Sequence, residues 1–330
     1  TDDKEGDTVI IKRPKYIEAI TPFIGQPLVK ILSGVRRCGK STIFDMLKEE
    51  LLSSGIDKKC IITKTYTDMD IAQNITAKQM YDELVCVTKD NVYSYLILDE
   101  IQEISGWEKV VNSLLEKGNC DIYVTGSNSK LMSSEISTYL TGRYVQIPVY
   151  TLSFSEYLQF KSESKLTKRE LLNEYIRFGG FPVVALNEYE SNMAYQIVNG
   201  IYYTVVSRDI VNRHRIHKQE LFDRVVRYVV ENTGKTFSAN SISKFLKSEN
   251  RQLSNESIYN YLRWLEQAFI IYPCRRYDLQ GKNILKTQEK YYLADVSLKY
   301  ALFGYNRNML DAVMENIVYL ELKRRGYDVY

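Results

Sequence analysis

The chain has 330 residues, 45% of them hydrophobic and 26% charged, with a formal net charge of +3, a composition typical of a globular protein of two or three domains. Five scattered cysteines and two histidines form no zinc-binding pattern, so we interpret the cysteines as reduced core thiols. No apolar run approaches the roughly 18 residues of a membrane span, and the acidic opening TDDKEGD is no signal peptide, so we expect a cytoplasmic protein without a membrane partner.

Strand and helix patterns alternate over the first 150 residues, after a helical lead-in at residues 16–21. Strands are expected at 27–33, 60–66, 92–100, 120–126 and 144–150, and helices at 39–55, 75–89, 105–118 and about 128–139, with Thr76 as a helix cap. Because such alternation builds parallel sheets, we predict an α/β core over residues 1–150, with helices on both faces. Ligands of these sheets bind beyond the carboxyl ends of the strands.

The segment GVRRCGKST follows the first of these strands and opens the first long helix. It matches the pattern GxxxxGK[ST] in full. The glycines allow a tight turn whose N–H groups face phosphate oxygens, and the helix N-terminus adds positive charge. Lys40 is expected to reach the β- and γ-phosphates, and Ser41 to hold Mg²⁺. We therefore predict an ATP site formed by Gly34, Val35, Arg36, Arg37, Cys38, Gly39, Lys40, Ser41 and Thr42.

Two acids end the apolar strand YLILDE. Asp99 is expected to bind Mg²⁺ through water, and Glu100 to orient and activate the attacking water. The simpler alternative is a polar turn after a buried strand, but the phosphate loop one βα unit upstream argues against it. The next strand ends at Ser127 and Asn128. Either can stand between water and the γ-phosphate, or cap the helix that follows.

Arg143, in LTGRYV, is a further catalytic candidate. An arginine near the γ-phosphate stabilises charge in the transition state and comes from the same chain or from a neighbour, so a homo-oligomer is one expectation. The alternative, which the sequence alone slightly favours, is a surface arginine before a strand.

Several motifs in this order resemble those of the prokaryotic AAA-type ATPases of the AAA_14 family that carry a C-terminal DUF4143 region. They are GVRRCGKST, LILDEIQ, DIYVTGSNSKLMSSEISTYLTGR, LSFSEYL, RFGGFP, EKYYLAD and ENIVYLELKRRGYDVY. The resemblance implies an ATPase core of the additional-strand class. Its Walker A motif corresponds to residues 34–42, its Walker B motif to Asp99 and Glu100, its sensor to Ser127 or Asn128, and its GR motif to Arg143.

The next two regions are interpreted as a helical lid, residues 151–217, and a winged helix-turn-helix, residues 218–290. Gly179 and Gly180 mark a structural turn in the lid. Three helical patterns, with Ser238 and Ser254 as caps, precede a hairpin across LQGKN. The third helix offers Asn255, Tyr259, Asn260 and Arg263 on its polar face. Residues 208–286 carry a net charge of +7, so double-stranded DNA is the predicted partner, with an oligomerisation or docking surface as the alternative.

Residues 291–330 are interpreted as the start of the DUF4143 region, which by resemblance opens a restriction-endonuclease-like fold at Glu315. The sequence stops in the strand-like RRGYDVY with no further carboxylate set, so we expect a truncated region without nuclease activity. Glu315 would then be a helix acid that caps the helix or pairs with a nearby base such as Arg324 or Arg325. Taken together, the sequence patterns and the resemblance predict an α/β P-loop NTPase that hydrolyses ATP with Mg²⁺. The alternatives are a nucleotide-controlled interaction switch and a small-molecule kinase.

Overall fold

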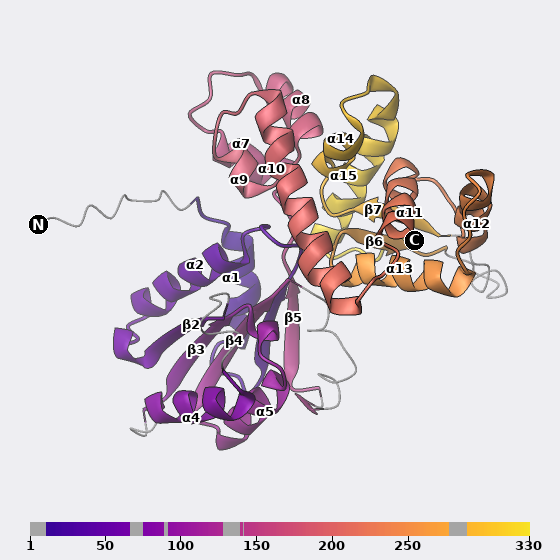
Figure 1. Ribbon diagram of the computed structural model, residues 1–330. Coiled ribbons are helices and arrows are strands. Elements are labelled where there is room, and N and C mark those ends of the chain that lie inside the picture. The colour runs from indigo at the N-terminus through magenta and orange to yellow at the C-terminus, as the bar shows by residue number, and fades with distance from the viewer. Residues whose placement is uncertain (1–10, 67–74, 89–91, 128–138, 141, 277–288) are drawn as a thin grey trace, which may run out of the picture. The chain divides into compact units, whose positions relative to one another are not determined.

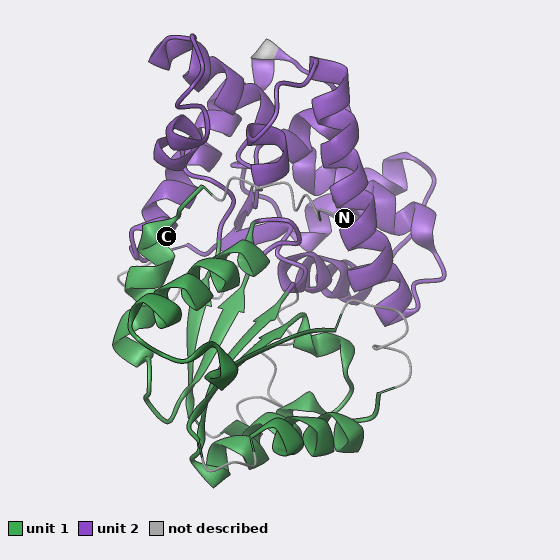
Figure 2. Ribbon diagram, turned by 90° about the vertical axis from the view of Figure 1, so that its left-hand side faces the viewer, with its two compact units in different colours: residues 1–33, 39–126, 131–149 green, residues 34–38, 127–130, 150–330 purple. Residues whose placement is uncertain are grey.

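A computed structural model describes residues 11–66, 75–88, 92–127, 139–140, 142–276 and 289–330 (Figure 1). The chain divides into two compact units (Figure 2). Unit 1 comprises residues 1–33, 39–126 and 131–149, and unit 2 comprises residues 34–38, 127–130 and 150–330. The short segment 34–38, which leads into the GKST sequence, thus belongs to unit 2.

Unit 1 is built on a five-stranded parallel sheet in the order β2-β3-β4-β1-β5. The strands are β1 (Val29–Ser33), β2 (Ile61–Thr65), β3 (Ser94–Asp99), β4 (Cys120–Gly126) and β5 (Tyr144–Pro148). The helices are α1 (Pro14–Ile20), α2 (Lys40–Ser53), α4 (Ala77–Val87) and α5 (Trp107–Lys117), with 3₁₀ turns at Thr21–Phe23, Lys58–Cys60 and Ile101–Glu103. The predicted parallel α/β core is confirmed, and β4 is the additional strand between β1 and β3.

The helices of unit 1 cover both faces of this sheet, as expected from the alternation. Figure 1 shows α1 and α2 on one side and α4 and α5 on the other. The residues of β1 and β4 are buried throughout, because both faces are covered. Thr76 caps α4 in a reciprocal capping box with Gln79, as the sequence predicted.

An ion pair joins Lys30 on β1 to Asp121 on the neighbouring strand β4, and both side chains are fully buried. Asp121 also accepts hydrogen bonds from the Tyr123 hydroxyl at 2.6 Å and the Gly25 N–H at 2.8 Å. Burial lowers the pKa of Lys30, and the hydrogen bond and charge of Asp121 oppose that shift. The remaining lone pairs of the carboxylate are therefore satisfied, which a buried charge requires.

Unit 2 begins with the helices of the predicted lid, α7 (Phe154–Phe160), α8 (Lys168–Phe178), α9 (Pro182–Ala185) and α10 (Ser191–Thr204), which continues as a π-helical segment, η5 (Val205–Asn212). There follow α11 (Gln219–Glu231), α12 (Ala239–Ser248), α13 (Asn255–Gln267), β6 (Ile271–Cys274) and β7 (Lys290–Leu293). The last elements are α14 (Ser297–Phe303), η6 (Arg307–Met309) and α15 (Leu310–Arg324). The boundaries expected after residues 217 and 290 fall inside unit 2, the second of them within β7. Residues 327–330 form no strand.

The two glycines of RFGGFP are required by close packing against distant backbone and a buried acid. Gly179 has a φ of 71°, and a Cβ there would lie 1.7 Å from Asp295 Oδ1. A Cβ on Gly180 would lie 2.4 Å from the carbonyl oxygen of Leu152. The Gly180 N–H donates to Asp295 Oδ2 at 2.8 Å, and the Ser297 N–H donates to Oδ1 at 3.0 Å. The turn is therefore structural, as the sequence suggested.

Candidate functional site

The phosphate-loop sequence lies between β1 and α2, where the sequence placed it. Gly39 has a φ of 99° and Arg37 one of 69°, both in the left-handed region. Only the glycine takes this conformation without steric cost, which explains its place before the helix. The Cys38 N–H donates to the carbonyl oxygen of Val35 at 3.2 Å and closes a turn. Lys40 is the first residue of α2 and is only 4% exposed.

In unit 1, Ser41 in the first turn of α2 meets Asp99, the last residue of β3. The Ser41 hydroxyl donates to Asp99 Oδ2 at 2.7 Å. The Thr125 hydroxyl, near the end of β4, donates to Asp99 Oδ1. Asp99 is 8% exposed, so these hydroxyls replace much of the water that would otherwise solvate the carboxylate. A hydroxyl and a carboxylate within hydrogen-bond distance are hard oxygen ligands of the kind that Mg²⁺ selects, and the pair fits a metal held partly through water.

Glu100 leaves β3 with a sharp change of backbone direction. Its φ is 52°, which is uncommon for a residue with a side chain. Its N–H donates to the Thr125 hydroxyl at 2.9 Å, and its Oε2 accepts from Gln102 Nε2 at 2.5 Å. The strained turn is thus held from both sides, and Glu100 is 8% exposed beside Asp99.

Sequence reasoning missed Thr125, which binds both Asp99 and the backbone of Glu100. The strand order explains its role, because β4 lies between β1 and β3 and Thr125, near the carboxyl end of β4, is therefore next to the end of β3. In DIYVTGSNS the sequence predicts functional roles for Ser127 and Asn128 instead. Ser127 follows β4 directly and is fully buried, and Asn128 lies outside the described residues. Their roles as sensors stay predictions.

Arg143 directly precedes β5 and so lies at the amino end of the parallel strands, whereas the phosphate loop follows the carboxyl end of β1. Its carbonyl oxygen accepts the N–H of Val29, the first residue of β1, at 3.0 Å. The strand rise of about 3.3 Å per residue places it roughly 15 Å from the carboxyl end. Its guanidinium donates to Asn112 at 2.7 Å and lies 3.5 Å from Glu116. An action of Arg143 on the nucleotide of its own chain therefore does not fit the sheet, and only the action on a neighbouring chain stays a prediction.

Residues 219–293 of unit 2 show the expected order of three helices and an antiparallel strand pair. An antiparallel bridge joins Phe237, between α11 and α12, to Glu289. Ser238 and Ser254 cap α12 and α13 as predicted. The face of α13 expected to be apolar is buried, through Ile258, Tyr261, Leu262 and Leu265. On the opposite face Tyr259 is 46% exposed and Arg263 is also exposed. The loop between the strands, including LQGKN, lies outside the described residues.

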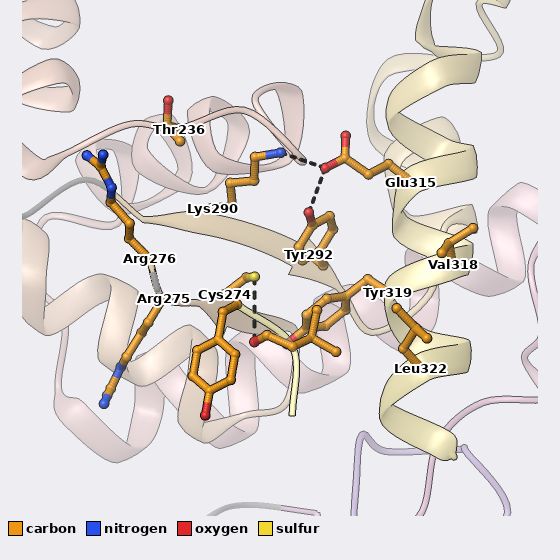
Figure 3. Close-up of a pocket in the computed structure, with 12 residues that line it drawn as sticks. Thr236, Cys274, Arg275, Arg276, Lys290, Tyr292, Glu315, Val318, Tyr319 and Leu322 are labelled. Atoms are coloured by element: carbon orange, nitrogen blue, oxygen red, sulfur yellow. Dashed lines mark hydrogen bonds and ion pairs between the residues drawn. The ribbon is translucent and has the colours of Figure 1, made fainter. Parts of the chain in front are cut away.

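The second part of unit 2 contains a cavity of about 670 Å³ next to Glu315 (Figure 3). Glu315 Oε1 accepts hydrogen bonds from Lys290 Nζ at 2.7 Å and the Tyr292 hydroxyl at 2.6 Å. Burial by itself would raise the pKa of Glu315, but these two hydrogen bonds outweigh it and lower the pKa. Other residues that line the cavity are Arg275, Arg276, Cys274, Tyr319, Leu322 and Tyr330.

The prediction that Glu315 pairs with Arg324 or Arg325 is wrong. Arg324 Nη2 donates instead to the carbonyl oxygen of Thr151 at 3.0 Å and that of Leu152 at 3.2 Å. Arg325 Nε donates to Glu321 at 2.8 Å. Both arginines lie nine or ten residues along α15, almost three helical turns away from Glu315, whereas β7 lies alongside the start of the helix.

Within the described part of the chain, no three His, Cys, Asp or Glu side chains gather as a metal-binding group. Among the same residues, none of the helices combines the length and the apolar character that crossing a bilayer would demand.

Comparison with known proteins agrees with this architecture. The family model described as "AAA domain" (AAA_14) matches residues 26–158, and a domain of unknown function, DUF8612, matches residues 169–308. The expected DUF4143 region, residues 291–330, is not shown by this comparison: the domain model found is DUF8612, and it covers the first part of that region, up to residue 308.

Curated relatives match almost the whole chain. An uncharacterised protein of Haemophilus influenzae is 35% identical over 97% of this chain and 80% of its own length. The uncharacterised protein MJ1544 of Methanocaldococcus jannaschii is 32% identical over 91% of this chain and 67% of its own length. Among solved structures, the Walker-type ATPase PABY2304 of Pyrococcus abyssi is similar with a TM-score of 0.61 and 14% identity, over 89% of this chain and 96% of that one. The chain therefore belongs to the family of these uncharacterised proteins and is an AAA-type member with the P-loop ATPase fold.

Proposed function

We propose that the protein binds ATP with Mg²⁺ at the loop of residues 34–42 and hydrolyses it. The observation that carries the proposal is the hydrogen bond between Ser41 and Asp99, which links the end of the phosphate-loop motif to the end of β3. This contact supports a metal site, because it brings two oxygen atoms from different chain segments together beyond the carboxyl end of β3, where ligands of such sheets bind.

Each residue of this group has a distinct task in the proposal. The N–H groups of the loop and Lys40 bind the phosphate oxygens, and Ser41 and Asp99 hold the metal. Bound Mg²⁺ neutralises charge on the phosphates during transfer. Glu100 accepts a proton from the attacking water and orients it, because its carboxylate follows Asp99 in a turn fixed by Thr125.

Two substitutions test the proposal. Lys40→Ala should abolish ATP binding, measured by equilibrium titration with a fluorescent ATP analogue. Glu100→Gln should bind the analogue normally and hydrolyse ATP at least about a hundredfold more slowly, in the range of a lost general base. Glu103→Gln, a nearby acid on the turn after β3, is the matched control and should keep wild-type turnover. Undiminished binding in Lys40→Ala, or undiminished turnover in Glu100→Gln, would overturn the assigned role.

We further propose that residues 219–293 contact double-stranded DNA through α13. The net charge of +7 over residues 208–286 and the exposed polar face of α13 support this function. Lys244→Ala with Arg263→Ala should weaken duplex binding and flatten its dependence on salt, because phosphate contacts release counterions. Both side chains are exposed, so the fold should be unaffected. If the wild-type protein binds no duplex even at low salt, a nucleotide-controlled interaction switch becomes the better interpretation.

A further inference from the structure

The proposed mechanism leaves unused an ion pair inside unit 2 that involves the phosphate loop itself. Arg36 Nε lies 3.4 Å from Asp209 Oδ2, and Arg36 Nη2 lies 3.4 Å from Asp209 Oδ1. The two side chains are 12% and 3% exposed. The guanidinium therefore faces the carboxylate with two nitrogens toward two oxygens, largely away from water, although the residues are 173 positions apart in the chain.

Asp209 is placed by an unusual stretch of helix. It lies within η5 (Val205–Asn212), a π-helical continuation of α10. π-Helical turns are rare and are frequently found at functional sites. Val205, Val206 and Ile210 around it are buried, so the segment carries the carboxylate on its apolar side. A carboxylate in such surroundings requires a charged or hydrogen-bonding partner, and Arg36 fulfils this requirement.

Arg36 in turn is part of a loop whose backbone conformation matters. The next residue, Arg37, has a φ of 69°, and such a conformation persists only where its surroundings hold it. A two-nitrogen contact fixes the direction of an arginine side chain better than a single point charge. The partner on η5 is thus suited to hold the loop in one conformation before any phosphate arrives.

We propose that Asp209 is a positioning residue for nucleotide binding. Through Arg36 it holds residues 34–38 in the conformation whose N–H groups receive phosphate, and it connects this loop to η5. This inference rests on the proposed function, because it takes nucleotide phosphate as the ligand of the loop. Since preorganised donors bind without a cost of ordering, loss of the contact weakens binding.

The first test measures the affinity for ATP in the full chain. Asp209→Asn keeps the size of the side chain and removes the charge, and it should raise the Kd for ATP about tenfold while kcat changes little. Asp209→Glu restores a carboxylate and should recover part of the affinity. In an Arg36→Gln background, Asp209→Asn should cause no further loss, because Asp209 acts through Arg36. Glu190→Gln, an exposed acid at the start of α10, is the control.

A second measurement needs no nucleotide and separates this inference from the proposed function. Hydrogen exchange of the amides of residues 34–38 should be faster in Asp209→Asn than in the wild type, with the control unchanged. Arg36→Lys, which keeps the charge but not the two-nitrogen contact, should reproduce both effects if Asp209→Asn does not fold. A wild-type protein that fails to bind ATP overturns the proposed function. The exchange rates then still show whether Asp209 holds residues 34–38 in one conformation. Equal Kd values and equal exchange rates overturn the inference, as does tighter ATP binding in Asp209→Asn, which would mean that Asp209 competes with phosphate.

Discussion

Thr125→Val should lower both the stability of unit 1 and the proposed rate of ATP hydrolysis. Valine has nearly the shape of threonine but can neither donate to Asp99 nor accept from the Glu100 N–H at 2.9 Å. A hydrogen bond to a charged group contributes about 1.5–3 kcal/mol, and a buried N–H left without an acceptor costs about 1–3 kcal/mol. We therefore expect the free energy of unfolding of unit 1 to fall by about 3 kcal/mol. Turnover should fall at least about tenfold, because in the proposed mechanism the carboxylates of Asp99 and Glu100, which Thr125 positions, act at the reacting phosphate.

The unfolding of unit 1 in urea can be followed by tryptophan fluorescence. The chain has two tryptophans, Trp107 in unit 1 and Trp264 in unit 2, so a Trp264→Phe background leaves only Trp107 as the fluorescent probe. Thr63→Val on the edge strand β2 is the matched control, because that side chain is exposed. If Thr125→Val and Thr63→Val share one unfolding free energy and one turnover rate, the bridging role of the hydroxyl is wrong.

Three further changes test the packing of each unit by thermal melting. Gly180→Ala should prevent folding of unit 2 or lower its melting temperature strongly, because the new Cβ meets backbone oxygen, whereas Gly200→Ala, in a helix with open space around it, should be neutral or slightly stabilising. Asp121→Ala should cost about 3–5 kcal/mol, because it leaves the buried charge of Lys30 with the carbonyl oxygen of Gln26 but without its carboxylate partner, and an unchanged melting curve would show that the pair adds nothing. Glu315→Gln should destabilise the protein above pH 4.3 or so, the usual pKa of an unfolded glutamate, and the difference from wild type should vanish as pH falls through the lowered pKa of the folded state; a difference that grows in acid would contradict this assignment.

Features that depend on near neighbours in the chain could be predicted from the sequence. Strands and helices of unit 1 follow from alternating and 3.6-residue apolar patterns, which are local consequences of backbone geometry. The phosphate loop is a contiguous motif, and the caps Thr76, Ser238 and Ser254 bind N–H groups only three residues away. The edge occupied by Arg143 could also have been predicted, since a residue that precedes a parallel strand lies at the amino end of the sheet.

The distant residues that complete the site could be identified only in the folded chain. The order of strands in a parallel sheet is set by how helical crossovers pack, so no local pattern announces that β4 lies between β1 and β3 and carries Thr125 to Asp99. The partner of Arg36 lies 173 residues away, and that of Glu315 lies on a strand 25 residues earlier. Such pairs depend on long-range packing of apolar faces, which brings charges together without leaving a periodic trace in the sequence.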